Sequence, residues 1–272
     1  MDRRPLLFFD SGIGGVPYCS GYSLRSPGEP LVYAADRLHF PYGKRSREDV
    51  ISIVLSLMKR LSVLVDPKLV IVACNTASVS ALGALRETFP ALPFVGTVPA
   101  IKPAAAGSRA RKIGVLGTER TVEDAYIAGL ALKYGNGCEI TALAAPDLVE
   151  FVERRYIDAD AEERRGAVLP WIRRFRESGV DALVLGCTHF LFLREEFRKE
   201  ASPDIAVYDS IEGISDRIDA LLDEKNLRAR AEKTGSGLFI VTGGAPAETS
   251  WRRWADRLGF RLSLPDSGAE DP

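Results

Sequence analysis

The chain has 272 residues, of which 46% are hydrophobic and 27% are charged, the balance of a globular protein. Its formal net charge of −1 gives no electrostatic reason to expect binding to nucleic acid or to an anionic membrane surface. The length suits two domains of ordinary size, and no apolar run approaches the ~20 residues of a membrane span.

The number and spacing of the cysteines and histidines argue against a disulfide framework and a metal site. The four cysteines, at positions 19, 74, 138 and 187, lie far apart and form no CxxC pair. This argues against a disulfide framework and favours a reduced, cytoplasmic setting. The chain has only two histidines, and no paired ligand spacing predicts a zinc site, so we expect no metal.

Short apolar runs alternate with amphipathic segments from one end of the chain to the other. The runs predict strands at 6–9, 31–35, 69–74, 94–98, 113–116, 140–144, 182–187, 205–208 and 238–241. The amphipathic segments predict a helix of about five turns after Ser46 and further helices that begin at Pro146 and at 193, run from after Ser210 to 224, and span 77–89, 122–134, 161–177 and 247–258. The helix at 161–177 is expected to be interrupted or kinked near Pro170. Alternating strands and helices indicate parallel sheets.

Similar junctions between a strand and a polar turn recur in both halves of the chain. We therefore predict an α/β fold of two similar domains, each with a mainly parallel sheet flanked by helices. Ligands bind at the carboxyl ends of parallel strands, so we expect the active site in the cleft between the domains. The expected first domain is 1–97, completed by 208–272, and the second is 98–207.

Two of these junctions end in a cysteine. The apolar run that ends at Cys74 has a counterpart that ends at Cys187, and each thiol is followed by Asn or Thr at the start of a helical segment. A cysteine at a strand end is usually a small buried residue. Backbone N–H groups at a helix start, however, lower the pKa of a nearby thiol and bind anions, so we interpret this pair as functional. Cys19 and Cys138 lack this context and are expected to be structural.

Several other thiol chemistries fit the pattern less well. A phosphatase-type loop needs an arginine soon after the cysteine, and neither thiol has one at that spacing. A cysteine hydrolase uses one thiol and one base, which would leave the second thiol unexplained. Two thiols in corresponding places suit removal of a proton from one face of a carbon and its delivery to the other.

Neighbouring ionisable residues are candidates to assist the thiols. Asp10 ends the first strand and is expected to orient Cys74 or share its proton. His189 lies two residues past Cys187, and Glu153 is a weaker candidate on an amphipathic helix. The glycine-rich stretch 12–15 lacks the dinucleotide-binding spacing, because Pro17 stands where the third glycine would be, so no cofactor is expected.

With these motifs in place, the chain resembles the cofactor-independent aspartate/glutamate racemase superfamily, and within it the glutamate racemase family. The motifs that carry the resemblance span most of the chain: Asp10-Ser11-Gly12, Pro41-Tyr42-Gly43, Cys74-Asn75-Thr76, Gly117-Thr118, Gly186-Cys187-Thr188-His189 and Asp209-Ser210. The resemblance implies interconversion of L- and D-glutamate for peptidoglycan synthesis, in the cytoplasm and commonly by a homodimer.

The resemblance also assigns roles to residues. It implies that the acid–base thiols are Cys74 and Cys187, assisted by Asp10, Glu153 and His189. The implied substrate ligands are Asp10, Ser11, Pro41, Tyr42, Gly43, Asn75, Thr76, Thr118, Thr121, Thr188 and His189. The chain departs from the family pattern at Val16-Pro17-Tyr18, Ala145-Pro146-Asp147, Glu150 and Phe190-Leu191.

Two other functions remain open at this point. One is a racemase for aspartate or another amino acid, because the shared motifs report the reaction better than the substrate side chain. The other is a protein that binds an amino acid without turning it over.

Overall fold

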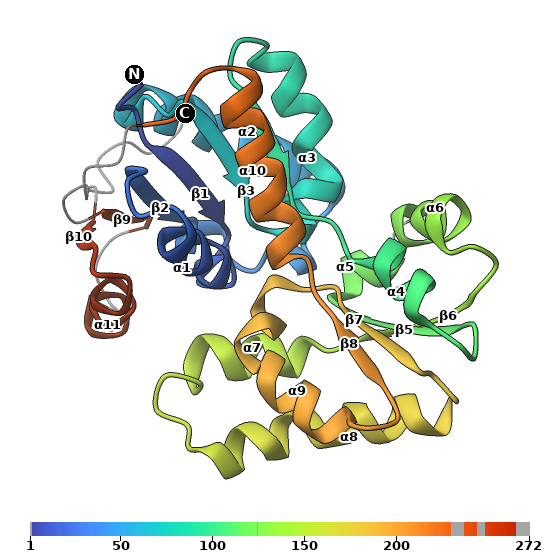
Figure 1. Ribbon diagram of the computed structural model, residues 1–272. Helices are drawn as coiled ribbons and strands as arrows, with labels where there is room; N and C mark the ends of the chain where they lie inside the picture. Colours follow the sequence, from blue (N-terminus) through green and yellow to red (C-terminus); the bar gives the residue numbers. More distant parts are fainter. Residues whose placement is uncertain (1, 124, 230–236, 244–247, 265–272) are drawn as a thin grey trace. The chain divides into compact units, whose positions relative to one another are not determined.

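The computed structural model describes residues 2–123, 125–229, 237–243 and 248–264 (Figure 1). The chain divides into two compact units, one made of Met1–Thr97 with Ile211–Pro272 and the other of Val98–Ser210. The second unit extends slightly beyond the expected residue 207, because strand β8 (Ala206–Tyr208) pairs with its sheet. Within the described part of the chain, every helix is too short or too polar to traverse a lipid bilayer.

The first unit is built on a six-stranded sheet with the order β10-β9-β2-β1-β3-β4, in which every pairing is parallel. Its strands are β1 (Leu6–Asp10), β2 (Leu31–Ala35), β3 (Leu69–Val72), β4 (Phe94–Gly96), β9 (Leu238–Val241) and β10 (Arg261–Ser263). The three central strands β1, β2 and β3 are buried along their whole length. Burial on both faces explains why they appear in the sequence as unbroken apolar runs.

Helices cover both faces of this sheet. They are α1 (Val16–Arg25), α2 (Arg47–Val65), α3 (Asn75–Thr88), α10 (Ile211–Glu224) and α11 (Glu248–Leu258), with the 3-10 segments η1 (Arg37–His39) and η2 (Tyr42–Lys44). Alternate β1 side chains point to opposite faces. Leu7 and Phe9 enter the core that α2 and α3 share, whereas the Phe8 ring contacts Tyr22 of α1. The expected first residue of α11, Ala247, lies outside the described residues.

The second unit holds a four-stranded parallel sheet with the order β6-β5-β7-β8. Besides β8, its elements are β5 (Lys112–Gly117), β6 (Glu139–Ala144), β7 (Ala182–Leu185), α4 (Ile101–Gly107), α5 (Glu119–Glu123), α6 (Ala125–Tyr134), α7 (Pro146–Arg154), α8 (Ala161–Glu177), η3 (Thr188–Leu193) and α9 (Arg194–Ala201). Of the interruption or kink expected near Pro170, the interruption is absent, because α8 runs through this residue as one helix. The expected α/β class, with parallel sheets flanked by helices, is confirmed (Figure 1).

The two sheets share one pattern of strand order. In each unit the first strand lies between the second and the third, as β2-β1-β3-β4 and as β6-β5-β7-β8. The connections therefore leave in opposite directions from β1 and β3, and likewise from β5 and β7. Such a reversal leaves the carboxyl ends of the two neighbouring strands uncovered and creates the usual ligand position of a parallel sheet.

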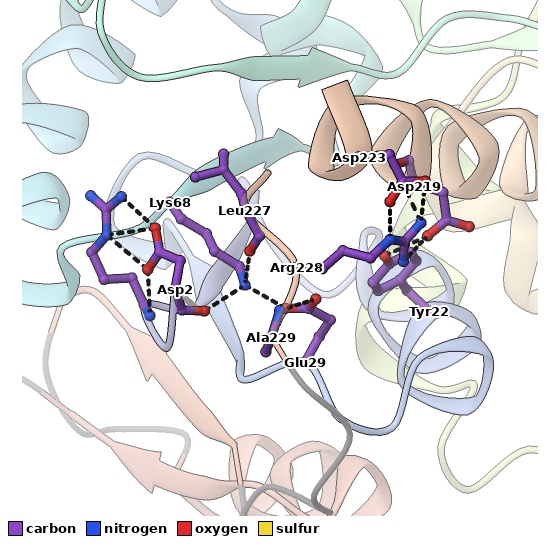
Figure 2. A network of polar contacts seen from close by, with 10 residues as sticks. Asp2, Tyr22, Glu29, Lys68, Asp219, Asp223, Leu227, Arg228 and Ala229 are labelled. Carbon is purple, nitrogen blue, oxygen red and sulfur yellow. Dashed lines mark hydrogen bonds and ion pairs between the residues drawn. The ribbon is translucent and has the colours of Figure 1, made fainter. Parts of the chain in front are cut away.

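A buried ion pair ties distant segments together at the amino edge of the first sheet (Figure 2). Lys68, just before β3, donates through Nζ to Glu29 Oε2 at 2.6 Å, and both side chains are almost fully buried. The same ammonium donates to the carbonyl oxygens of Leu227 at 2.7 Å and Asp2 at 3.1 Å. Glu29 accepts in turn from the backbone N–H of Ala229 at 2.9 Å. The segment after α10 is thus fixed to the first unit by charge-assisted hydrogen bonds.

We expect Lys68→Met to lower the free energy of unfolding by about 3–5 kcal/mol, because it leaves the Glu29 carboxylate buried without its cation. Urea unfolding followed by circular dichroism measures this loss. The control is Arg154→Ala, which removes an exposed pair with Glu150 and should cost at most about 0.5 kcal/mol. Equal losses in the two variants would show that the buried pair does not stabilise the fold.

Candidate functional site

The first group of candidate site residues surrounds Cys74 at the switch between β1 and β3. We call Asp10, Ser11, Tyr42, Cys74, Asn75 and Thr76 the Cys74 cluster. Cys74 lies two residues beyond β3 and is the N-cap of α3, which begins at Asn75 rather than at the expected Ala77. The thiol is therefore held at a helix start, where backbone N–H groups favour negative charge.

A chain of polar contacts links a carboxylate to this thiol. The Ser11 hydroxyl donates to Asp10 Oδ1 at 3.1 Å, and Ser11 Oγ lies 3.9 Å from Cys74 Sγ. Asp10 also accepts from the backbone N–H of Gly12 at 3.4 Å and is fully buried. The hydrogen bonds to Asp10 offset the cost of burying its charge.

Tyr42 enters the Cys74 cluster from η2. Its ring packs in the same core as Cys74, and its hydroxyl donates to Asp36 Oδ2 at 2.6 Å. Burial, together with the negative charge of Asp36 and smaller contributions from Cys74 and Asp10, raises the pKa of Tyr42 well above its usual range. The phenol is therefore a neutral hydrogen-bond donor.

Asp36 was not among the residues expected from the sequence. It lies at the carboxyl end of β2, is 1% exposed, and accepts from Tyr42, from His39 Nδ1 at 2.9 Å and from the Thr242 hydroxyl at 2.6 Å. The three contacts hold the loop that contains Pro41 and Gly43. The sequence does carry a signal for Asp36, because it is a carboxylate directly after a buried apolar run, as Asp10 is.

The glycine-rich stretch after Asp10 is shaped by close contact with β3. A Cβ on Gly15 would lie 2.7 Å from the Cβ of Ala73, closer than real contacts allow. Tyr33 holds the stretch by donating to the Gly12 carbonyl at 2.8 Å and accepting from the Gly15 N–H at 3.1 Å. The requirement for glycine here is steric and keeps Ser11 next to Cys74.

The second group of candidate site residues surrounds Cys187 at the switch between β5 and β7. We call Cys187, Thr188, His189 and Glu153 the Cys187 cluster. Cys187 lies two residues beyond β7 and is the N-cap of η3. The backbone N–H of the preceding residue, Gly186, donates to the Leu116 carbonyl oxygen at 2.7 Å, and a Cβ added to Gly186 would lie 2.9 Å from that oxygen. The thiol is thus fixed by a tight backbone approach to β5.

His189 bridges the thiol and a carboxylate. Its Nδ1 lies 3.7 Å from Cys187 Sγ, and its Nε2 lies 2.7 Å from Glu153 Oε1 on α7. Burial disfavours the imidazolium, but the hydrogen bonds with Cys187 and Glu153 outweigh it and raise the pKa of His189 well above 6.5. Both contacts thus favour the imidazolium form of His189.

Thr118 directly follows β5, and Thr121 lies in α5. Both belong to the same unit as the Cys187 cluster. Their hydroxyls are 2.9 Å apart, and the Thr121 N–H bonds Thr118 Oγ1 at 3.2 Å. Thr121 is 1% exposed. Both hydroxyls lie at the carboxyl end of the strand that neighbours β7.

The predicted site residues thus fall into two groups, each within one unit. The first unit holds Asp10, Ser11, Pro41, Tyr42, Gly43, Cys74, Asn75 and Thr76, and the second holds Thr118, Thr121, Glu153, Cys187, Thr188 and His189. Cys19 is buried in α1, where burial raises the pKa of its thiol, and Cys138 belongs to neither cluster. Among the described residues, no group of three or more His, Cys, Asp and Glu side chains could hold a metal ion.

Comparison with known proteins gives a consistent family. Residues 22–214 match the family model described as Asp/Glu/Hydantoin racemase. The chain is 38% identical over 265 residues to the glutamate racemase of Treponema pallidum, covering 96% of this chain and 97% of the relative. The chain is 35% identical over 264 residues to the glutamate racemase of Roseiflexus sp. strain RS-1, and the match covers 96% of this chain and 93% of the relative.

Solved structures agree with the sequence relatives. The crystal structure of Escherichia coli glutamate racemase, in complex with L-glutamate and the activator UDP-MurNAc-Ala, is similar with a TM-score of 0.82 and 31% identity. The match covers 96% of this chain and 97% of that one.

We expect Glu153→Gln to lower the titration midpoint of His189 by about 1–3 pH units, because a neutral amide cannot stabilise the imidazolium. NMR spectra resolve this directly, since the chain has only two histidines. The His39 signal is the internal control, because its carboxylate partner Asp36 is unchanged. An unmoved His189 midpoint would show that Glu153 does not set its protonation.

Proposed function

Because the chain belongs to the Asp/Glu/hydantoin racemase family, we propose that it interconverts L- and D-glutamate with Cys74 and Cys187 as its two acid–base groups. The observation that carries this proposal is the repeated strand order, which sets one thiol at the switch point of each sheet. Each thiol is also linked to a carboxylate through one intervening polar side chain, Cys74 to the buried Asp10 through Ser11 and Cys187 to the partly buried Glu153 through His189.

In the proposed cycle, one cysteine begins as a thiolate and the other as a thiol. The thiolate removes the α-proton of glutamate, and the electron pair of the C–H bond stays on the substrate as a carbanion. The other thiol donates its proton to the opposite face of the same carbon and becomes the thiolate. The substrate leaves with inverted configuration, no net proton is consumed, and the reverse reaction uses the same groups in exchanged roles.

The α-proton of an amino acid is very weakly acidic, so charge stabilisation must supply most of the acceleration. The N-terminus of α3, which begins with Asn75 and Thr76, supplies N–H groups suited to a substrate carboxylate. The other proposed substrate ligands are Asp10, Ser11, Pro41, Tyr42, Gly43, Thr118, Thr121, Thr188 and His189. They lie at carboxyl ends of strands or in the loops that follow.

The product D-glutamate is a building block of peptidoglycan, which gives the enzyme its role in cell-wall synthesis. Glutamate is preferred over aspartate as the proposed substrate, because the relatives and solved structures with full-length similarity are glutamate racemases. We place the enzyme in the cytoplasm and propose that it is a homodimer, on the resemblance of the sequence to this family.

We expect Cys74→Ser and Cys187→Ser each to lower racemisation of L- and of D-glutamate by about 10²–10⁴-fold, the usual effect of removing an acid–base group. Circular dichroism of glutamate incubated with purified protein and no added cofactor measures the rate. In D₂O the wild type should incorporate deuterium at the α-carbon. Parallel assays with aspartate test the choice of substrate.

The matched control is Cys138→Ser, since Cys138 lies outside both clusters and should leave the rate unchanged. A Cys74→Ser or Cys187→Ser protein that racemises both enantiomers at the wild-type rate would contradict the two-thiol mechanism.

A further inference from the structure

Three donors from different parts of the first unit converge on one carboxylate, that of Asp36. Its Oδ2 accepts from the Tyr42 hydroxyl at 2.6 Å, and its Oδ1 accepts from the Thr242 hydroxyl, also at 2.6 Å. The His39 imidazole donates through Nδ1, which lies 2.9 Å from Oδ2 and 3.1 Å from Oδ1. Hydroxyl-to-carboxylate hydrogen bonds of this short length are among the stronger ones in proteins.

The backbone of Asp36 is fixed separately from its side chain. Its N–H donates to the carbonyl oxygen of Asp10 at 2.8 Å, and the N–H of Thr242 donates to the carbonyl oxygen of Ala35 at 3.0 Å. These bonds continue the pairing of β2 with β1 and with β9 beyond the last residue of β2. The sheet therefore gives the carboxylate a fixed position, from which it can hold the irregular segment that follows.

The segment 37–45 contains the two short 3-10 turns η1 and η2. Hydrogen-bond geometry in 3-10 turns is poorer than in an α-helix, and two of the backbone bonds that close these turns are long, at 3.3 Å and 3.5 Å. One side chain from each turn, His39 from η1 and Tyr42 from η2, donates to the Asp36 carboxylate. These side-chain bonds thus hold a segment whose own backbone bonds are weak.

Tyr42 connects this anchor to the Cys74 cluster. The residue is 1% exposed, and its ring packs in the core that also contains Cys74. A phenol has one proton to donate, and that of Tyr42 is donated to Asp36. The carboxylate therefore determines where the ring lies relative to Cys74, and with it the two residues beside the ring, Pro41 and Gly43.

We infer that Asp36 is a positioning residue for the proposed reaction, which holds Tyr42 and the segment 37–45 in the geometry that binds the substrate. The carboxylate is 1% exposed and both of its oxygens are engaged by the three donors, so it acts through Tyr42 rather than on the substrate. This inference rests on the proposed function, which makes Pro41, Tyr42 and Gly43 substrate ligands. A segment that holds the substrate equally in the ground state and in the transition state affects KM more than kcat.

Steady-state kinetics of Asp36→Asn test this role. An amide has one acceptor oxygen instead of two and cannot serve all three donors. We expect KM for L-glutamate to rise about 10- to 100-fold, the size of the effect of a hydrogen bond to a charged group, and kcat to fall less than about threefold. A purely structural role would instead reduce the amount of folded enzyme, which lowers the apparent kcat and leaves KM unchanged.

Further variants assign the effect to the two hydroxyl donors. Tyr42→Phe combined with Asp36→Asn should raise KM no further than Asp36→Asn alone, since the carboxylate acts through the phenol. Thr242→Val removes the other hydroxyl and should raise KM about two- to tenfold, which keeps the test available if Asp36→Asn does not fold. Thr242→Ser keeps the hydroxyl and should restore the wild-type KM. The matched control is Asp66→Asn, which changes an exposed carboxylate of the same unit and should leave KM unchanged.

Hydrogen–deuterium exchange followed by mass spectrometry measures the same role without catalysis. In full-length Asp36→Asn the backbone amides of 37–45 should exchange about tenfold faster than in the wild type, because the segment opens locally more often. The amides of β5, which belongs to the second unit, should exchange at the wild-type rate.

An unchanged exchange rate in 37–45, an unchanged KM, or two KM increases that multiply in the double variant would overturn the inference. The racemisation rates of Cys74→Ser and Cys187→Ser are measured separately and decide the proposed function. If these variants are inactive while Asp36→Asn behaves as the wild type, only the positioning role is wrong. If they retain the wild-type rate, the two-thiol mechanism is wrong, and the KM and exchange measurements still decide the role of Asp36.

Discussion

Strand order in the two parallel sheets determines where chemistry can occur in this protein. In each sheet the chain places its first strand between its second and third, so the connections diverge at the carboxyl ends of two neighbouring strands. The space above a strand end that no connection covers is open to polar side chains and to ligands. Cys74 and Cys187 lie at these positions, and polar contacts through Ser11 and His189 link them to Asp10 and Glu153. Glycines at positions 15 and 186 then allow the backbone to approach closely enough to fix each sulfur.

Buried or partly buried carboxylates give each region its polarity. Asp10 and Asp36 in the first unit and Glu153 in the second each accept hydrogen bonds from specific side chains. A buried carboxylate without such donors would be protonated or destabilising. The donors differ between the two regions, since a serine hydroxyl contacts Asp10 and an imidazole contacts Glu153.

Much of the fold could be read from the sequence because its central strands are buried on both faces. Continuous apolar runs marked β1, β2, β3, β5 and β7, and polar residues directly after them marked Asp10, Cys74 and Cys187. Helix α1 escaped prediction because Pro17, Ser20 and Gly21 interrupt its apolar pattern, and tertiary packing against α10 stabilises it instead. The pair of Lys68 with Glu29 was missed, since the two residues lie 39 positions apart in the sequence. Pairwise contacts of that range leave no local pattern.

The bond between Thr242 and Asp36 joins residues 206 positions apart, and it has a consequence for biosynthesis. Residues 98–210 form the second unit as one continuous segment, so everything that unit needs has left the ribosome before the first unit is complete. The loop beside Cys74, in contrast, gains its Thr242 anchor only after residue 242 has been made. During translation the segment that carries Cys187 is therefore complete before the loop beside Cys74 can gain this anchor.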